Sequence, residues 1–532
     1  MAGLSHAASF DARVEALFRP PLGEWMALSP DGQRVAYTSP AGGKLAIVIL
    51  NVENPGRKRT VPVEPWTDAA SAENKPPVQL RFLRWATADR LVYALTERVV
   101  PLPTVTDKAG RSAPNPDGPT ILSPILAADA DGKQRGTVVD ARDFQETPDD
   151  ARRSLADFLR TPKQLSAVRN EPIRWRMPHL DVLGFLPQDR NQLIIGTRGA
   201  YSLPTSHLVD LRTGNVREFG DDWAAPPREP QVYDWFRLKV VGERQDGVQP
   251  ATLWRDEDLG RVQRELAAKF PRRIVELLDW SDTHARVLFR VTGGTDPGRV
   301  FVYQRLEDLA VEILQRAPWL NAAKLNATRF FEFDAADGAH LSGYLTWPGN
   351  PRLTPPPLLL IFPSEFPGRA QPAFDPESQV LADLGFAVAR LNHRSVAGAK
   401  GEDIAVLRAA VDRVAVDDGR AAIEWIAARN PERPFDRKRI ATLGRGFGGY
   451  LAVRALQQQP TVFRCGVAID APPELRTRLA GPAGTPDHLQ LESQSFVDKP
   501  ESRAALYRKV EEFFNLQLGN FAVKIGPTKE VP

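Results

Sequence analysis

The sequence has little of what marks a disulfide-bonded, membrane-spanning or nucleic-acid-binding protein. Cys465 is its single cysteine, so no internal disulfide can form, and we expect this residue to act as a small buried hydrophobe. The longest apolar runs, such as residues 358–362, are far too short to cross a bilayer. The 69 basic and 66 acidic residues leave a net charge of +3, which gives no electrostatic reason to expect nucleic acid or a membrane as a partner.

No charged and hydrophobic leader opens the sequence, which as given predicts a cytoplasmic protein. The A-A-S step at residues 7–9 would be the tail of a cleaved signal if an upstream segment were missing, and the protein would then be periplasmic or secreted. A chain of 532 residues, 42% hydrophobic and 25% charged, has a globular composition and is too long for one core. At least two domains are therefore expected.

Short strands alternate with polar turns from about residue 25 to about residue 320. The strand at 26–28 runs through S-P-D-G (Ser29–Gly32) into an alternating strand at 34–38, which is typical of a β-hairpin. Such degenerate repeats favour a β-propeller over residues 1–320, with a fibrous or sandwich fold as the alternative. Variants of the unit lie at 83–93, 182–196 and 275–290, and the expected interruptions are a loop at 101–120 and helices at 149–160 and 260–270.

Residues 321–532 have a different pattern. After a hairpin at 330–347 and a proline-rich link, buried strands alternate with amphipathic helices, which predicts a doubly wound, mostly parallel sheet. The strands are expected at 358–362, 386–391, 440–443 and 467–469, and the helices at 377–384, 406–429 and 501–516.

One stretch in this second half has the pattern of a catalytic turn. Residues 440–450 read I-A-T-L-G-R-G-F-G-G-Y, an apolar strand followed by a glycine cluster and a helix. The nucleophile elbow G-x-S-x-G has this form, and its glycines allow positive φ and close packing of helix on strand. The serine position holds Gly446. A phosphate loop lacks support because the G-K-[ST] ending is missing, and an ordinary strand-to-helix turn is the other alternative.

The motifs of both halves, taken together, resemble those of the prolyl oligopeptidase family of serine peptidases, with its dipeptidyl-peptidase and acylaminoacyl-peptidase members. The resemblance implies a β-propeller (1–320) followed by an α/β-hydrolase domain (321–532) that is shortened at its C-terminal end. The motifs that carry it are S-P-D-G (29–32), T-D-P-G (295–298), F-D-P-E-S-Q (374–379), L-G-F-A-V (384–388), L-N-H-R (391–394), V-D-D-G (416–419), D-R-K-R-I (436–440), G-F-G-G-Y (446–450), F-R-C-G-V-A-I (463–469), K-P-E-S-R (499–503) and Y-R-K-V-E-E-F-F (507–514).

The sequence departs from this family at each catalytic position. The family's chemistry needs a serine, an acid and a histidine in that order. Gly446 replaces the serine, and Gln494, in L-E-S-Q-S-F, stands where the histidine is expected and cannot act as a general base near neutral pH. The segment before Gln494 is too short for the strands that carry the acid. We therefore expect no catalytic residue, metal or cofactor, and interpret as vestigial Gly444, Gly446, Phe447, Gly448, Gly449 and Gln494.

The oxyanion loop is also altered, because the family's H-G-G-P is replaced by P-S-E-F-P at 363–367. Ser364 in this loop, Arg445 and Tyr450 are the candidate binding residues. Arg445 either points a cation into the former pocket or forms a surface salt bridge. The backbone N–H of Phe447 is expected to survive as an oxyanion donor.

Three further positions have structural expectations. His488 is the only histidine after the elbow and could pair with Asp470 or Glu474, but its turn-like segment favours a solvated loop residue. His393, which replaces an aromatic residue of the family, is expected to pack. Arg394 and the Asp417–Asp418 pair are expected to hold the strand-to-helix loops together.

Four functional hypotheses follow. The first is a pseudo-peptidase that binds peptides or a protein partner, and the second is an active serine-type hydrolase that uses Ser364. The third is an interaction protein whose propeller carries the function, and the fourth is a decaying gene product without a ligand. The oligomeric state is undetermined, although missing strands would expose a sheet edge that favours dimerisation or aggregation.

Overall fold

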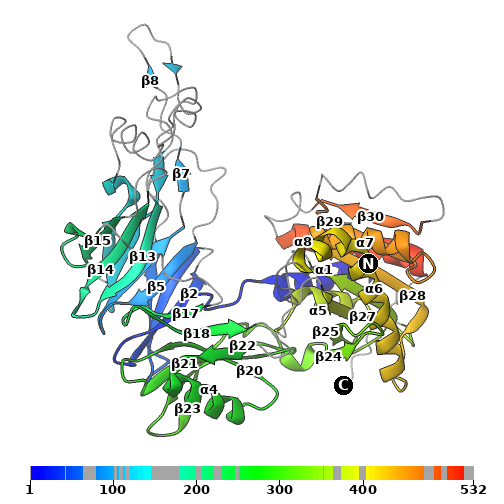
Figure 1. Cartoon of the computed structure of the whole chain (residues 1–532), viewed down its shortest axis with the longest axis horizontal. Coiled ribbons are helices and arrows are strands. Elements are labelled where there is room, and N and C mark those ends of the chain that lie inside the picture. Colours follow the sequence, from blue (N-terminus) through cyan, green and yellow to red (C-terminus); the bar gives the residue numbers. More distant parts are fainter. Residues whose placement is uncertain are drawn as a thin grey trace.

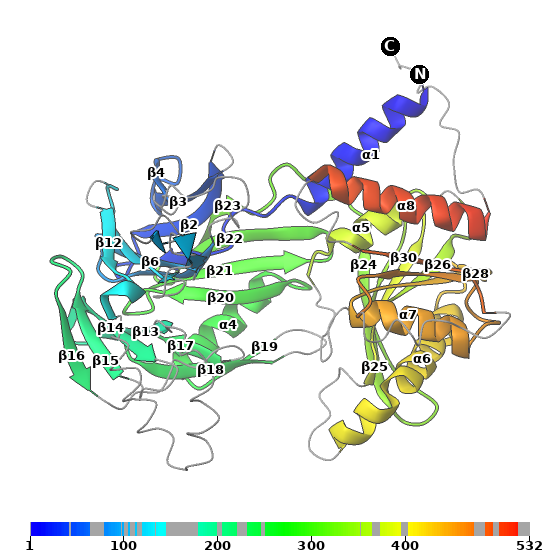
Figure 2. The same cartoon turned by 90° about the horizontal axis from the view of Figure 1, so that it is seen from above.

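The computed structural model shows two β-rich domains and an N-terminal helix (Figures 1 and 2). The residues that it describes are 2–41, 44–63, 79–96, 98–100, 105–106, 112–113, 120–132, 135–144, 179–198, 205–220, 231–245, 251–351, 353–363, 373–394, 403–472, 485–492 and 500–519.

The described residues of the first domain form five antiparallel sheets of three or four strands, each built from consecutive or nearly consecutive strands, besides two small strand pairs. They are β1 (Met26–Leu28), β2 (Arg34–Ala41), β3 (Lys44–Asn51) and β4 (Lys58–Pro62); β5 (Leu80–Trp85), β6 (Arg90–Leu95), β11 (Ile125–Asp129) and β12 (Arg135–Val139); β13 (His179–Leu186), β14 (Asp189–Arg198), β15 (Thr205–Asp210) and β16 (Val216–Gly220); β17 (Gln231–Asp234), β18 (Lys239–Gln245) and β19 (Ala251–Trp254); and β20 (Ile274–Trp280), β21 (Arg286–Gly293), β22 (Asp296–Gln304) and β23 (Leu309–Gln315).

Within each sheet, strands that are neighbours in sequence pair as antiparallel hairpins, and the residues of the turns favour this arrangement. Met26–Leu28 pairs with Val35–Tyr37, and Gly32 closes the S-P-D-G turn at φ 73°. The fourth sheet has three strands, and helix α4 (Glu257–Lys269) follows it, capped by the Asp256 carboxylate. The hairpin at 26–38 and the helix at 260–270 are thus confirmed. The helix expected at 149–160 lies outside the described residues.

Short elements complete this domain. Within the loop expected at 101–120, the described residues include short paired strands. These elements are β7 (Arg98–Val100) with β10 (Thr120–Leu122), β8 (Val105–Thr106) with β9 (Ser112–Ala113), and the 3₁₀ turns η1 (Ala141–Phe144) and η2 (Ala322–Lys324).

The five sheets pack against one another in a closed ring. Apolar clusters join each sheet to the next, and one cluster brings Val35 and Leu50 of the first sheet against Leu288 and Val302 of the fifth. The backbone N–H of Leu28 donates to the Asp279 carboxylate across the same junction, at 2.8 Å. The β-propeller prediction is confirmed, and the described residues form five blades.

The second domain contains one mixed, mostly parallel sheet in the order β24-β25-β27-β26-β28-β29-β30. Only the pairs β24–β25 and β25–β27 are antiparallel. The strands are β24 (Thr328–Asp334), β25 (His340–Thr346), β26 (Pro357–Phe362), β27 (Ala387–Asn392), β28 (Asp436–Arg445), β29 (Cys465–Ile469) and β30 (His488–Leu491), and the helices are α5 (Pro376–Asp383), α6 (Asp403–Arg429), α7 (Phe447–Gln458) and α8 (Pro500–Leu518). The doubly wound prediction is confirmed.

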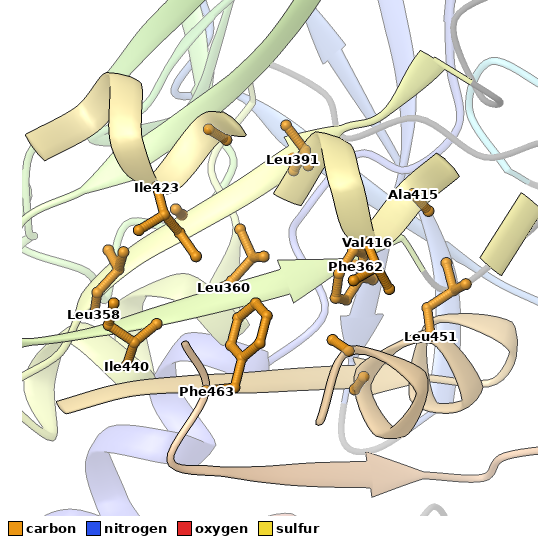
Figure 3. Packing of buried hydrophobic residues seen from close by; sticks show 14 of the residues in the cluster. Leu358, Leu360, Phe362, Leu391, Ala415, Val416, Ile423, Ile440, Leu451 and Phe463 are labelled. Carbon is orange, nitrogen blue, oxygen red and sulfur yellow. The ribbon is translucent and has the colours of Figure 1, made fainter. Parts of the chain in front are cut away.

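Helices cover both faces of this sheet. On one face, α6 and α7 bury a cluster around Leu360, Phe362, Ile423 and Leu451 (Figure 3). On the other, α5 and α8 pack over residues such as Val467, and Cys465 lies fully buried there, as expected. Because both faces are covered, the parallel strands read as continuous apolar runs.

The N-terminal helix α1 (Ala2–Phe18) packs on the second domain, although residues 1–320 were assigned to the propeller. Val14 and Leu17 are buried in the cluster of α5 and α8, and Figure 2 shows α1 beside α8. Arg13 pairs with Asp383 at 2.9 Å, and Arg508 pairs with Asp11. Amphipathic periodicity does not reveal which domain a helix covers, and the boundary at residue 320 itself stays a prediction.

Candidate functional site

The turn between β28 and α7 places Gly446 at the carboxyl edge of the parallel sheet. Gly446 has φ 52° and ψ −125°, a backbone conformation that residues with a side chain rarely adopt. Its N–H donates to the carbonyl of Ile469 at 2.8 Å, and its own carbonyl accepts from Gly449 at 3.0 Å and Tyr450 at 3.3 Å. A sharp, strained strand-to-helix turn of this kind is the nucleophile elbow, here without a hydroxyl.

The flanking glycines are required by close backbone approach. A Cβ atom on Gly444 would lie 2.0 Å from the carbonyl oxygen of Gly448, and one on Gly448 would lie 2.3 Å from that of Pro363. A Cβ atom on Gly449 would also be crowded, because it would lie 3.1 Å from the carbonyl oxygen of Gly444. These contacts explain the glycine cluster without invoking a phosphate ligand.

The loop after β26 meets the elbow where an oxyanion donor would be expected. The carbonyl oxygens of Phe362 and Pro363 face Gly448, and Pro363 has no N–H to donate. Phe447 begins α7 beside this loop. Ser364, the next residue of the loop, lies outside the described residues, as do Glu474 and Gln494, so their predicted roles stay predictions.

Arg445 forms a salt bridge, as one of the two alternatives predicted, but the pair is partly buried between helices instead of lying on the surface. Its Nε donates to Glu377 of α5 at 2.9 Å, and its Nη2 donates to the Tyr507 hydroxyl of α8 at 3.1 Å. The Tyr507 hydroxyl in turn donates to the same Glu377 oxygen at 2.9 Å. Burial opposes the charge of Arg445, but the Glu377 carboxylate keeps the pKa of the guanidinium raised.

No pattern in the sequence predicts this bonded group of Arg445, Glu377 and Tyr507. Glu377 lies in the F-D-P-E-S-Q motif and Tyr507 in the closing helix, so both were noted without a role. Their separations from Arg445, 68 and 62 residues, leave no local signal of pairing.

Tyr450 and His393 are buried core residues in this structure. Tyr450 is 3% exposed, and its hydroxyl donates to Asp412 of α6 at 3.3 Å. His393, directly after β27, is 1% exposed and packs edge-on to Phe362 with ring centroids 6.4 Å apart, as expected. Burial lowers the pKa of His393 to about 4, so the ring is neutral at pH 7.

Arg394, directly after β27, bonds one of the two expected aspartates, but that residue lies within α6 and the second partner lies in the β24–β25 turn, so the contact does not join strand-to-helix loops. Its guanidinium bonds Asp418, whose side chain is fully buried, at 2.6 Å and also pairs with Asp337 at 2.7 Å. The geometry is that of a structural ion pair held by charge-assisted hydrogen bonds.

His488 cannot pair with Asp470, and the expectation of a solvated loop residue is wrong. His488 begins β30 and lies opposite Gly466 of β29, whereas Asp470 follows the far end of β29. Four residues of strand separate the two by about 13 Å. The strands β28, β29 and β30 are parallel. His488 lies where they begin and Gly446 lies where they end, so the two residues are at opposite ends of the strands. The polar, proline-flanked sequence around His488 concealed this strand.

Other site classes find no support among the described residues. They hold no group of three or more His, Cys, Asp or Glu side chains placed to bind a metal ion. In the same part of the chain, no helix is long and apolar enough to span a membrane.

The comparisons with known proteins agree with this architecture. Residues 372–482, which include the elbow, match the model of the prolyl oligopeptidase family. The likeness in sequence to this family therefore covers the part of the α/β sheet that contains Gly446. No curated protein sequence matches the chain.

Solved structures extend the likeness in fold to the propeller. The acylaminoacyl peptidase of Pyrococcus horikoshii in an orthorhombic crystal form is 13% identical, with a TM-score of 0.51, over 95% of this chain and 90% of that one. The uncomplexed form of the same peptidase gives 13% identity and a TM-score of 0.50 over the same shares. At this identity the likeness establishes the arrangement of a β-propeller followed by an α/β sheet.

Proposed function

We propose that this protein is a non-catalytic member of the prolyl oligopeptidase family, which binds peptides or a protein partner without cleaving them. The observation that carries the proposal is Gly446 at the apex of an otherwise intact elbow. Acyl transfer by this family's chemistry begins with attack of a serine oxygen on a carbonyl, and glycine has no such oxygen.

The surroundings of Gly446 support the same conclusion. Pro363 supplies a carbonyl instead of an N–H donor at the start of the oxyanion loop. His488, the one histidine that follows the elbow in sequence, lies at the opposite end of the parallel strands from Gly446. His393 directly follows β27, which β26 separates from β28, so it is about 10 Å from the elbow strand.

The test is covalent labelling of the full chain. A fluorophosphonate probe, which reacts with activated serines, should leave the intact mass unchanged, and a panel of chromogenic peptides should show no turnover above buffer. The Gly446→Ser variant restores the missing hydroxyl and should also stay unlabelled, because neither His393 nor His488 lies beside it to act as the general base.

The Ser364→Ala variant separates the proposal from an active hydrolase with an unusual nucleophile. Turnover by the unmodified chain that is lost in Ser364→Ala would contradict the proposal, as would a probe adduct on any residue of the elbow. Equal, background-level readings from the unmodified chain and both variants would support it.

A further inference from the structure

The first strands of four of the five blades, together with Trp25 before the first strand of the remaining blade, surround a cavity of about 550 Å³. In each sheet the first strand is at an edge, and β5, β13, β17 and β20 all contribute side chains to the cavity together with Trp25, which precedes β1. The cavity is therefore at the centre of the propeller, and Figure 1 labels these four strands. Its volume is in the range of sites for small molecules.

One wall of this central cavity is aromatic. Trp235 meets Phe82 edge-on with ring centroids 5.0 Å apart, and meets Tyr233 in the same way at 5.1 Å. Trp235, Tyr233 and Trp25 are each partly exposed at the cavity surface, whereas Phe82 is 5% exposed behind them. Rings fixed edge-on present apolar surface on which a planar ligand group can stack.

Most charges in the cavity wall already have partners. The Asp234 carboxylate accepts from two backbone N–H groups and pairs with Arg237 at 2.7 Å. Asp279 is deeply buried and accepts from the N–H groups of Leu28 and Trp280; burial raises the pKa of its carboxyl, and the charge of Arg84 opposes that rise. Arg244 pairs with Glu276 at 3.2 Å.

Arg84 differs from these groups. Its Nη1 donates to the backbone carbonyls of Met26 at 3.3 Å and Leu83 at 3.0 Å, while its buried Nε has no hydrogen-bond partner. Among the described residues, no carboxylate is within ion-pair distance of this guanidinium. A guanidinium has five N–H donors in a planar fork that matches a carboxylate, so Arg84 retains donors for an anionic group at the cavity.

We propose that the centre of the propeller is a binding site for a small monocarboxylate with an aromatic ring, whose carboxylate pairs with Arg84 and whose ring stacks on Trp235 and Tyr233. A free small molecule and the C-terminal aromatic residue of a peptide both offer this chemistry. The inference rests on the proposed function only in treating the chain as a binding protein, since the cavity is in the other domain from Gly446.

The experiment is calorimetric titration of the full chain with a matched ligand series. The probes are 3-phenylpropionate, which has ring and charge, 3-phenylpropanamide, which lacks the charge, and butyrate, which lacks the ring. We expect 3-phenylpropionate to bind at least tenfold more tightly than either of the other two. The peptide Ala-Ala-Phe with a free carboxylate binds more tightly than 3-phenylpropionate if the natural ligand is a peptide end, and more weakly if it is a free small molecule.

Variants then assign the site. Arg84→Met should weaken 3-phenylpropionate binding at least tenfold and abolish the preference over the amide, whereas Arg84→Lys should retain part of it. Arg212→Gln, on an exposed turn of the third blade, is the matched control and should bind normally. Equal binding of acid and amide by the unmodified chain, no binding at millimolar concentration, or unchanged binding by folded Arg84→Met would overturn the inference. The ligand series uses the unmodified chain, so its result does not depend on whether a variant folds. The binding measurements are also independent of the labelling test at the elbow, so the two proposals can fail separately.

Discussion

Arg445, the residue before the empty nucleophile position, donates from Nε to the Glu377 carboxylate at 2.9 Å and so ties the elbow to α5. The two side chains are 28% and 17% exposed. The bond fixes the end of β28 from the side of the sheet opposite α7, and Tyr507 connects the same pair to α8. The elbow is thus tied to α5 and α8 by the hydrogen bonds among Arg445, Glu377 and Tyr507.

We expect Glu377→Ala to lower the free energy of unfolding by about 2 kcal/mol, because it leaves the partly buried Arg445 charge without its partner. Urea denaturation followed by circular dichroism measures this change. The matched control is Glu424→Ala, which breaks the exposed pair with Arg437, whose side chains are 56% and 54% exposed. That variant should change stability by less than about 1 kcal/mol. Equal losses in both variants would show that the Arg445 pair has no special role.

Stability should fall in mild acid because of His393. The pKa of His393 is about 4 in the folded chain and 6.5 for an unperturbed histidine, so the unfolded chain binds the proton more tightly. The contribution of neutral His393 is fully present above about pH 6.5 and is lost as the pH falls from there towards about 4, by about 3 kcal/mol in all. His393→Phe should remove this part of the acid sensitivity.

The measurement is the free energy of unfolding at pH 7 and pH 4.5 for both proteins. The difference between the two pH values should be smaller in His393→Phe by about 2 kcal/mol. An identical pH dependence in the unmodified chain and the variant would contradict the assignment to His393.

The only cysteine should be unreactive in the folded protein. Cys465 is fully buried in β29, and burial raises the pKa of its thiol to about 12, so very little reactive thiolate exists at pH 8. Titration with a thiol-specific chromogenic disulfide should give no signal from the native chain and one equivalent after denaturation. Fast reaction of the native chain would show that β29 is open to solvent.

Gly444→Ala tests the close packing of the elbow. Its Cβ would lie 2.0 Å from a backbone oxygen of Gly448, which no side-chain rearrangement can relieve. We expect a loss of at least about 3 kcal/mol in unfolding free energy. Gly136→Ala, on β12 with no atom within 4 Å of the new Cβ, is the control and should be nearly neutral. A mild effect at residue 444 would mean that the turn relaxes easily.

Elements with strong local signals could be predicted from the sequence. The Ser29–Gly32 turn, the apolar run of β26 and the capped helix α4 each carry their own turn, cap or periodicity, and the structure contains all three. The glycines around Gly446 were sufficient to predict the elbow, since few residues tolerate its backbone conformation.

The elements that were not predicted depend on contacts between distant residues. The short strand β30 gains its pairing from β29, and nothing in H-L-Q-L between polar neighbours reveals it. The partners of Arg445 and the position of α1 are likewise set by packing between segments far apart in the chain. The cavity at the centre of the propeller arises only when five separate blades close, which no single repeat encodes.

The position of α1 has a consequence for synthesis of the protein. Asp11 and Arg508 are 497 residues apart, yet their side chains pair across α1 and α8. The ribosome has therefore translated the whole propeller before α5 and α8, on which α1 packs, emerge, and until α5 appears the apolar side of α1 around Val14 and Leu17 has nothing of its own domain to cover it. A nascent chain of this protein should consequently depend on chaperones at its first helix while the propeller is being translated.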